Sequence, residues 1–206
     1  MTEATLEARA EVPSPRRRRP GPPRWLFHGV AALAALALLW AYSYPGMQVY
    51  FWLGSLLALL LLAAVWLVRL VIALWRPRQW SWWFVVAPVG GLLTLALLTY
   101  GVPLHARFVL SESAFQAQVK DLPAAPTDGA EWTDLAHPER IGSYRIIEVN
   151  RIAGGVVFWE ANGDFFDSVG FAWLPDGPSA VLESGSFENP QFTHLQGPWY
   201  AWTASW

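Results

Sequence analysis

The side chains best able to bind a metal or move a proton are few and scattered in this chain. The four histidines are His28, His105, His137 and His194. No two of them have the short spacing that places a pair of imidazoles on one zinc ion. The chain has no cysteine, which excludes disulfides, thiolate metal sites and cysteine nucleophiles. We therefore expect no metal and no cofactor.

Three carboxylates lie close together around a predicted turn, where they could bind calcium. They are Glu160, Asp164 and Asp167. The segment lacks the alternating Asp or Asn residues and the closing Glu of a calcium loop, so we interpret them as solvated turn acids.

Hydrolytic chemistry is not indicated by any group of residues. A glycosidase needs two carboxylates about 5 to 10 Å apart in a cleft, and the thirteen acids of residues 105 to 206 single out no pair. Ser179, Ser184 and Ser186 lie in no nucleophile-elbow pattern, and His194 has no identifiable partner. We expect no catalytic residues and a non-enzymatic protein, with an uncatalogued extracytoplasmic hydrolase as an alternative.

The carboxy-terminal aromatic residues are the candidate surface for a ligand or a partner. They lie in GPWYAWTASW, residues 197 to 206, and are Trp199, Tyr200, Trp202 and Trp206. A strand places Tyr200, Trp202 and Trp206 on one face, whereas a helix would align the three tryptophans. We favour the strand, because Gly197-Pro198 precedes it and aromatic residues favour sheets. The rings then fill a small core, stack on sugars, or dock on lipid headgroups or a partner protein.

These rings belong to residues 105 to 206, for which we predict an α+β domain. Ser111 is a capable N-cap for an amphipathic helix over residues 111 to 122. Three strands are predicted in SYRIIEVNRI (143 to 152), VVFWEA and FFDSVGFAWL, separated by the turn sequences AGG and NGD. They form an antiparallel β-meander, and the closing segment supplies a fourth strand to cover its apolar face.

The first of these strands alternates, which predicts what each face carries. We expect Tyr144, Ile146, Glu148 and Asn150 on one face and Val149 on the other.

Three long apolar segments precede this domain, and we predict that each is a transmembrane helix. They span residues 25 to 43, 47 to 75 and 82 to 104. About 20 apolar residues suffice to cross the hydrocarbon of a bilayer. The middle segment carries one charge, Arg69, near its end, where the side chain can reach the headgroups.

The arginines predict the orientation of these helices. The tail ends in SPRRRRPGPPR and the second link contains RPRQ, whereas the first link, YPG, has no base. Because short basic loops remain in the cytoplasm, we expect a multi-pass plasma-membrane protein with a cytoplasmic amino terminus and an extracytoplasmic carboxy-terminal domain. A cleavable signal peptide ending near Ala41-Tyr42-Ser43 is the alternative for the first segment, and it leaves that domain on the same side.

The charge is divided between the two halves of the chain. Residues 1 to 104 carry nine arginines and three acids, a balance of +6, whereas residues 105 to 206 carry five basic residues and thirteen acids, a balance of −8. Nucleic acid is excluded as a partner of the acidic half, since binding begins with clustered basic residues. Residues 1 to 24 are rich in Pro and Arg without apolar periodicity, which predicts a disordered cytoplasmic tail.

Two stretches, DSVGFAWLPDGP and HLQGPWYAWT, resemble the carboxy-terminal domain of small multi-pass membrane proteins of high-GC Gram-positive bacteria. The resemblance extends over residues 142 to 206. It implies a cell-envelope protein and brings no activity, cofactor or site residue. The excess of thirteen arginines over one lysine also indicates a GC-rich bacterial genome.

These patterns together predict a bacterial envelope protein with three transmembrane helices and a small extracytoplasmic α+β domain. Its expected role is that of a non-enzymatic accessory protein. The expected partners are the lipid bilayer and a membrane or envelope protein that the exported domain binds. A carbohydrate-binding module that holds wall glycan on the carboxy-terminal tryptophans is the main alternative.

Overall fold

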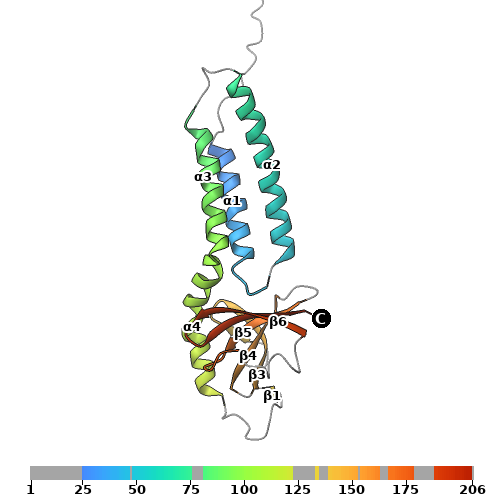
Figure 1. Ribbon diagram of the computed structural model, residues 1–206, viewed down its shortest axis with the longest axis vertical. Coiled ribbons are helices and arrows are strands. Elements are labelled where there is room, and N and C mark those ends of the chain that lie inside the picture. Colours follow the sequence, from blue (N-terminus) through green and yellow to red (C-terminus); the bar gives the residue numbers. More distant parts are fainter. Residues whose placement is uncertain are drawn as a thin grey trace, which may run out of the picture.

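The structure is a computed structural model that places three helices side by side above a sheet covered by a fourth helix (Figure 1). It describes residues 25–46, 48–75, 81–122, 133–134, 139–152, 154–162, 167–178 and 188–205. The predicted tail of residues 1 to 24, as well as His137, Asp164 and Trp206, lies outside these described residues.

The three upper helices are α1 (Trp25–Ala41), α2 (Val49–Leu74) and α3 (Trp83–Thr99). They fall within the three apolar segments of the sequence and end at Ala41, Leu74 and Thr99, before the predicted ends at residues 43, 75 and 104. Only α2 is by itself long and apolar enough to cross a bilayer. Helix α1 has 17 residues, and α3 passes the same test only together with α4, from which it is bent by 57°. The described residues therefore contain one clear candidate span, and two if the bent pair is one span.

Helix α4 runs from Val102 to Asp121 and begins about two turns earlier than the sequence suggested. Its N-cap is Gly101, at a φ of +63° that favours glycine, and Pro103 lies in the first turn. The predicted N-cap at Ser111 is therefore wrong. Ser111 lies inside the helix, where its hydroxyl donates a hydrogen bond to the Arg107 carbonyl oxygen at 3.1 Å.

The described strands form one antiparallel sheet in the order β1-β3-β4-β5-β7-β6, with β2 paired to β3 beside β1. Their bounds are Thr133–Asp134 (β1), Glu139–Ile141 (β2), Tyr144–Ile152 (β3), Gly155–Glu160 (β4), Asp167–Trp173 (β5), Glu188–Gln196 (β6) and Trp199–Ser205 (β7). The predicted meander is confirmed as β3, β4 and β5, and the closing segment is a strand that pairs with β5. Strand β6, which we did not predict, pairs with the outer edge of β7.

The alternation predicted for the first strand of the meander is interrupted in β3. Ile146 pairs with Glu160 and Glu148 pairs with Trp159, so Ile147 is an extra residue in a β-bulge. The bulge moves Val149 to the face of Tyr144 and Ile146. The prediction that Glu148 and Asn150 share that face is therefore wrong.

Apolar side chains are buried on both faces of the sheet. On one face, Phe108 and Phe115 of α4 pack against the rings of Tyr144, Phe158, Phe171 and Trp199. On the other face a second cluster is formed by Ile152, Val157, Ala172, Leu174, Trp202 and Ala204. Gly170 lets β4 and β5 lie close together, because a Cβ there would overlap the Phe158 carbonyl oxygen of β4 and lie 3.0 Å from Trp202 Nε1.

Candidate functional site

The tryptophans proposed as a ligand surface are buried in the sheet. Trp199 and Trp202 have 0% and 1% of their surface exposed, and they belong to the clusters on opposite faces. Tyr200 is half-buried, with its ring 5.1 Å from that of His194. Among the described residues, β7 therefore presents no exposed platform of indole rings.

The contacts of the two tryptophans are those of core residues. The Trp199 ring lies 5.5 Å from Phe108 and 5.7 Å from Phe115. Trp202 Nε1 donates a hydrogen bond to the Phe171 carbonyl oxygen at 3.2 Å, and its ring lies 4.8 Å from Trp159. Because apolar clusters lie on both faces of the sheet, β7 directs a large side chain into each of them.

A polar group with many partners lies where the helices meet the sheet domain. Arg107 of α4 places its guanidinium 4.5 Å from the ring centre of Trp40, 3.8 Å from Tyr44 and 4.6 Å from Tyr144. Trp40 belongs to α1, Tyr44 to the link between α1 and α2, and Tyr144 to β3. A cation among three aromatic rings is favoured by their quadrupoles, most strongly where water is displaced.

The same guanidinium is fixed by four hydrogen bonds. It donates to Ser43 Oγ at 2.9 Å, to the Tyr44 hydroxyl at 2.9 Å, and to Ser143 Oγ and carbonyl oxygen at 3.0 and 2.7 Å. Arg107 thereby joins a helix of the sheet domain to the α1–α2 link and to the turn between β2 and β3. The planar fork of arginine suits this arrangement, because its donors point in several fixed directions at once.

Further contacts tighten this junction. The Tyr144 hydroxyl donates to the Ser43 carbonyl oxygen at 3.1 Å. Burial raises the pKa of Tyr144 above its ordinary value, although Arg107 opposes the shift, so the phenol remains a donor. Close packing brings Gly46 against β5, where a Cβ would lie 2.6 Å from Val169 Cγ1. The α1–α2 link and the sheet are therefore in direct contact as well as hydrogen-bonded.

Of the two described acids of the predicted carboxylate group, Glu160 is buried, with 3% of its surface exposed. Its carboxylate accepts hydrogen bonds from the Asn162 backbone N–H at 2.7 Å and from Asn162 Nδ2 at 2.8 Å. Burial raises the pKa of Glu160, while these hydrogen bonds and the charge of Arg107 act in the opposite direction. Asp167 is half-buried on β5, and the described residues contain no group of three ligands that could hold a metal.

The described histidines are not brought together. His105 Nδ1 lies 2.9 Å from the Gly101 carbonyl oxygen, and His194 Nε2 lies 2.9 Å from that of Gly197. His28 stacks on Trp83 at 5.3 Å in the helical bundle. The three imidazoles therefore have separate partners, and within the described residues none forms a pair with a nucleophile or an acid.

Sequence reasoning missed Arg107 and the aromatic residues around it. Trp40 and Tyr44 lie at the end of the first apolar segment, where aromatic residues favour the membrane interface, and Arg107 entered the sequence analysis only through the charge balance. The available signal was a basic residue three positions after the third apolar segment, at the level where aromatic side chains favour the headgroups.

Comparisons with protein-family models, with curated protein sequences and with solved structures gave no match.

Proposed function

We propose that the chain is an integral membrane protein of the bacterial plasma membrane, and that its exported sheet domain binds a protein partner in a non-enzymatic, accessory role. Helices α1, α2 and α3 all cross the bilayer in this proposal. The amino terminus is cytoplasmic and the sheet domain lies outside.

The exposed apolar surface of the helical bundle supports the membrane assignment. Large side chains point outward on all three helices, among them Leu33, Leu36, Leu57, Leu60, Leu92 and Leu93. A soluble protein rarely exposes so large a continuous apolar surface, whereas a bilayer solvates it. With 17 residues, α1 and α3 are each about 25 Å long, within the range observed for short spans.

The contacts of Arg107 support retention of α1 in the mature protein. Trp40, Ser43 and Tyr44 supply two of the three rings and two of the hydrogen-bond acceptors around the guanidinium. Cleavage near Ser43 would remove or sever these contacts and expose Arg107. A retained first helix therefore fits the junction better than a signal peptide does.

The observation that carries the partner proposal is the outward face of α4. Leu110 has 85% of its surface exposed, and Val102 and Val109 are also exposed. Up to Ala117, the exposed residues of this helix include no charge, although a helix lying on a sheet normally turns charged residues to water. Because α4 follows α3 directly (Figure 1), this face adjoins the exposed apolar side chains of α3. It fits a partner that is itself a membrane protein.

Site-specific photo-crosslinking in native membranes tests this proposal. A photoreactive residue at Leu110 should form an adduct with one abundant protein, whereas the same residue at Lys120, exposed at the far end of α4, should not. Mass spectrometry identifies the adduct. Adducts with lipid alone at position 110, or equal protein adducts at both positions, would refute partner binding by this face.

The glycan-binding alternative loses its physical support. Sugar stacking needs exposed aromatic faces, and Trp199 and Trp202 are buried on opposite sides of the sheet. We therefore do not propose a carbohydrate-binding function.

A further inference from the structure

Two arginines lie opposite each other on the paired strands β2 and β3. Arg140 of β2 and Arg145 of β3 are direct partners in the antiparallel register, so their side chains project from the same face, and both are exposed. Like charges directly opposite each other destabilise a strand pair. Within the described residues, neither guanidinium has a hydrogen bond or an ion pair. The arrangement costs stability unless an anion lies between the two groups.

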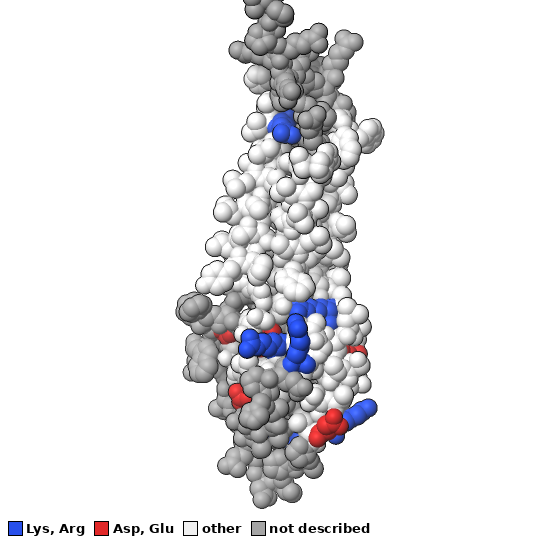
Figure 2. All heavy atoms as spheres, turned by 180° about the vertical axis from the view of Figure 1, so that it is seen from behind, with Lys and Arg blue, Asp and Glu red and all other residues white. Residues whose placement is uncertain are grey.

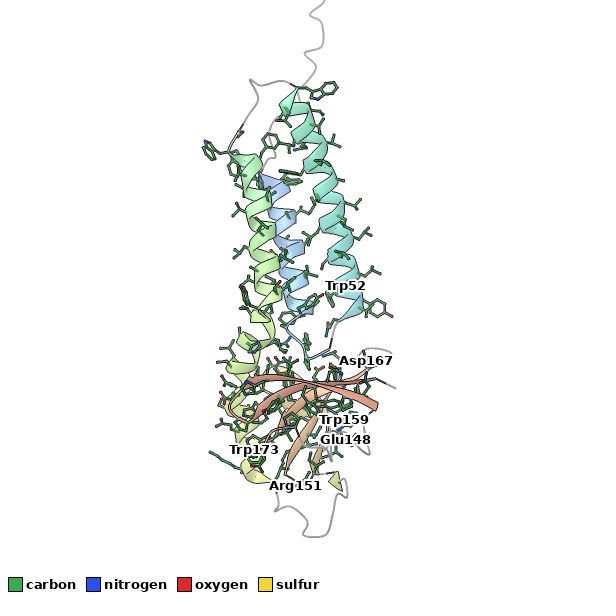
Figure 3. The ribbon with its side chains drawn as sticks, in the orientation of Figure 1. Trp52, Glu148, Arg151, Trp159, Asp167 and Trp173 are labelled. Carbon is green, nitrogen blue, oxygen red and sulfur yellow. The ribbon has the colours of Figure 1, made fainter. Side chains whose placement is uncertain are left out.

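The pair lies at the end of β3 that is nearest to the helices. Arg145 follows Tyr144, whose hydroxyl is bonded to Ser43 in the α1–α2 link. The far end of the same strand is marked by Arg151 (Figure 3), which lies away from the helical bundle. Figure 2 shows basic side chains gathered directly below the apolar surface of the helices. A third guanidinium, that of Arg107, is bonded to Ser143 two residues before Arg145.

Among the described acids, Glu160 lies near this pair but does not neutralise it. The Glu160 carboxylate accepts a hydrogen bond from the backbone N–H of Arg145, but it is buried and also held by Asn162. Its Cα partner is Ile146, on the core face of β3, whereas Arg145 projects from the opposite face. The two exposed guanidinium groups therefore keep a positive field toward the solvent or the membrane surface.

Neighbouring aromatic residues indicate the depth of the pair relative to a bilayer. Trp40 and Tyr42 are exposed at the end of α1, and Trp52 of α2 donates a hydrogen bond to the Tyr42 hydroxyl at 3.1 Å. Such rings favour the headgroup level, and Arg107 stacks on one of them. In a bilayer placed by these rings, the basic pair would lie within reach of lipid phosphates. Guanidinium forks match phosphate oxygens in charge and in geometry.

We propose that Arg140 and Arg145 bind the phosphate of an anionic lipid in the leaflet that faces the sheet domain. This inference rests on the proposed membrane topology. The lipid would neutralise the unfavourable pairing of the two arginines and hold β2 and β3 against the membrane surface.

The test uses the full chain, purified in a non-ionic detergent and titrated with phosphatidylglycerol or with phosphatidylcholine, with bound lipid counted by native mass spectrometry. The variant R140Q/R145Q removes the pair, and K120Q/R151Q removes two charges at the distal end of the domain. Each basic residue near an anionic surface contributes about fivefold in affinity, so the first variant should weaken phosphatidylglycerol binding about 20- to 30-fold. The second should bind like the unmodified chain, and phosphatidylcholine should bind more weakly throughout.

Equal loss in both variants, or no loss in either, would overturn the proposal and leave the arginines as charges that protect an edge strand from aggregation. Competition by inorganic phosphate at matched ionic strength would overturn it too, since the site would then take the free anion. Alkaline extraction of membranes from the same cells tests the membrane assignment independently of the lipid site. Release of the unmodified chain by alkali would contradict the membrane assignment. If the unmodified chain is retained and R140Q/R145Q binds phosphatidylglycerol as tightly as it does, only the lipid site is contradicted.

Discussion

Replacement of Arg107 should loosen the contact between the helices and the sheet domain while the sheet itself stays folded. Its guanidinium makes four hydrogen bonds of 2.7 to 3.0 Å and lies over three rings. A net value of about 1 kcal/mol for each hydrogen bond, less the part that water restores at this half-buried site, gives about 2 to 3 kcal/mol. The ring contacts add about 1 kcal/mol. The expected cost of R107A is therefore about 3 to 4 kcal/mol.

Hydrogen exchange of the full chain in detergent or nanodiscs measures this cost where it arises. The Ser143 backbone N–H is bonded to Ser111 Oγ at 3.2 Å, and that of Ser43 to the Trp40 carbonyl oxygen at 3.1 Å. Peptides containing these amides should exchange at least a hundredfold faster in R107A, while β5 and β7 keep their protection. R107K keeps the charge but loses the fork, so it should give an intermediate effect, and K120A should give none. Unchanged exchange at Ser43 and Ser143 in R107A would refute the role assigned to this residue.

Three further changes test the core and the buried acid. W199A should lower the free energy of unfolding by about 3 to 5 kcal/mol in chemical denaturation, because it empties a fully buried site; an unchanged midpoint would mean that the ring is not core. G170A should prevent folded protein from accumulating, since its Cβ would meet the Phe158 carbonyl oxygen, whereas G29A in α1, with no atom within 4 Å of the new Cβ, should accumulate normally. The raised pKa of Glu160 means that the folded state holds its proton more tightly than the unfolded state does. Stability should therefore fall as pH rises from the ordinary carboxyl pKa through the raised one, and E160Q should lack this slope; a wild-type slope of the opposite sign would contradict the burial argument.

The strands of the sheet domain were largely predictable from local patterns. Alternating apolar residues and turn sequences located β3, β4 and β5, and aromatic content after Gly197-Pro198 located β7. These signals are local, because a strand that buries a face repeats every two residues and ends at residues that favour turns. Strand β6 gave a weaker signal, because Pro190 lies within it and its register shifts between His194 and Gln196, which interrupts the alternation.

The errors arose where distant contacts override a local preference. Ser111 is a good N-cap in isolation, but here α4 starts at Gly101, and Ser111 is used instead to hold Ser143 of the sheet domain. The bulge at Ile147 leaves that side chain 43% exposed and depends on how β3 pairs with β4. Neither feature is encoded by neighbouring residues.

The candidate site at the junction was out of reach for the same reason. Arg107 meets Ser43 and Tyr44 across more than sixty positions of the chain. Composition and spacing indicate that aromatic residues lie near a membrane surface, but they do not indicate which cation lies among them. The basic pair of Arg140 and Arg145 likewise becomes visible only when the strand register is known.

Labelling of single cysteines in intact cells tests the central claim, that the helices hold the sheet domain outside the membrane, most directly. The chain has no native cysteine, so a single introduced cysteine can be labelled without background. The two positions are D176C, in an exposed turn of the sheet domain, and W75C, at the end of α2 that is farther from this domain. A membrane-impermeant maleimide should label D176C in intact cells and W75C only after the membrane is permeabilised. Labelling of W75C in intact cells with protection of D176C would show that the orientation is the opposite of the proposed one. Equal labelling of both positions only after lysis would contradict an exported domain.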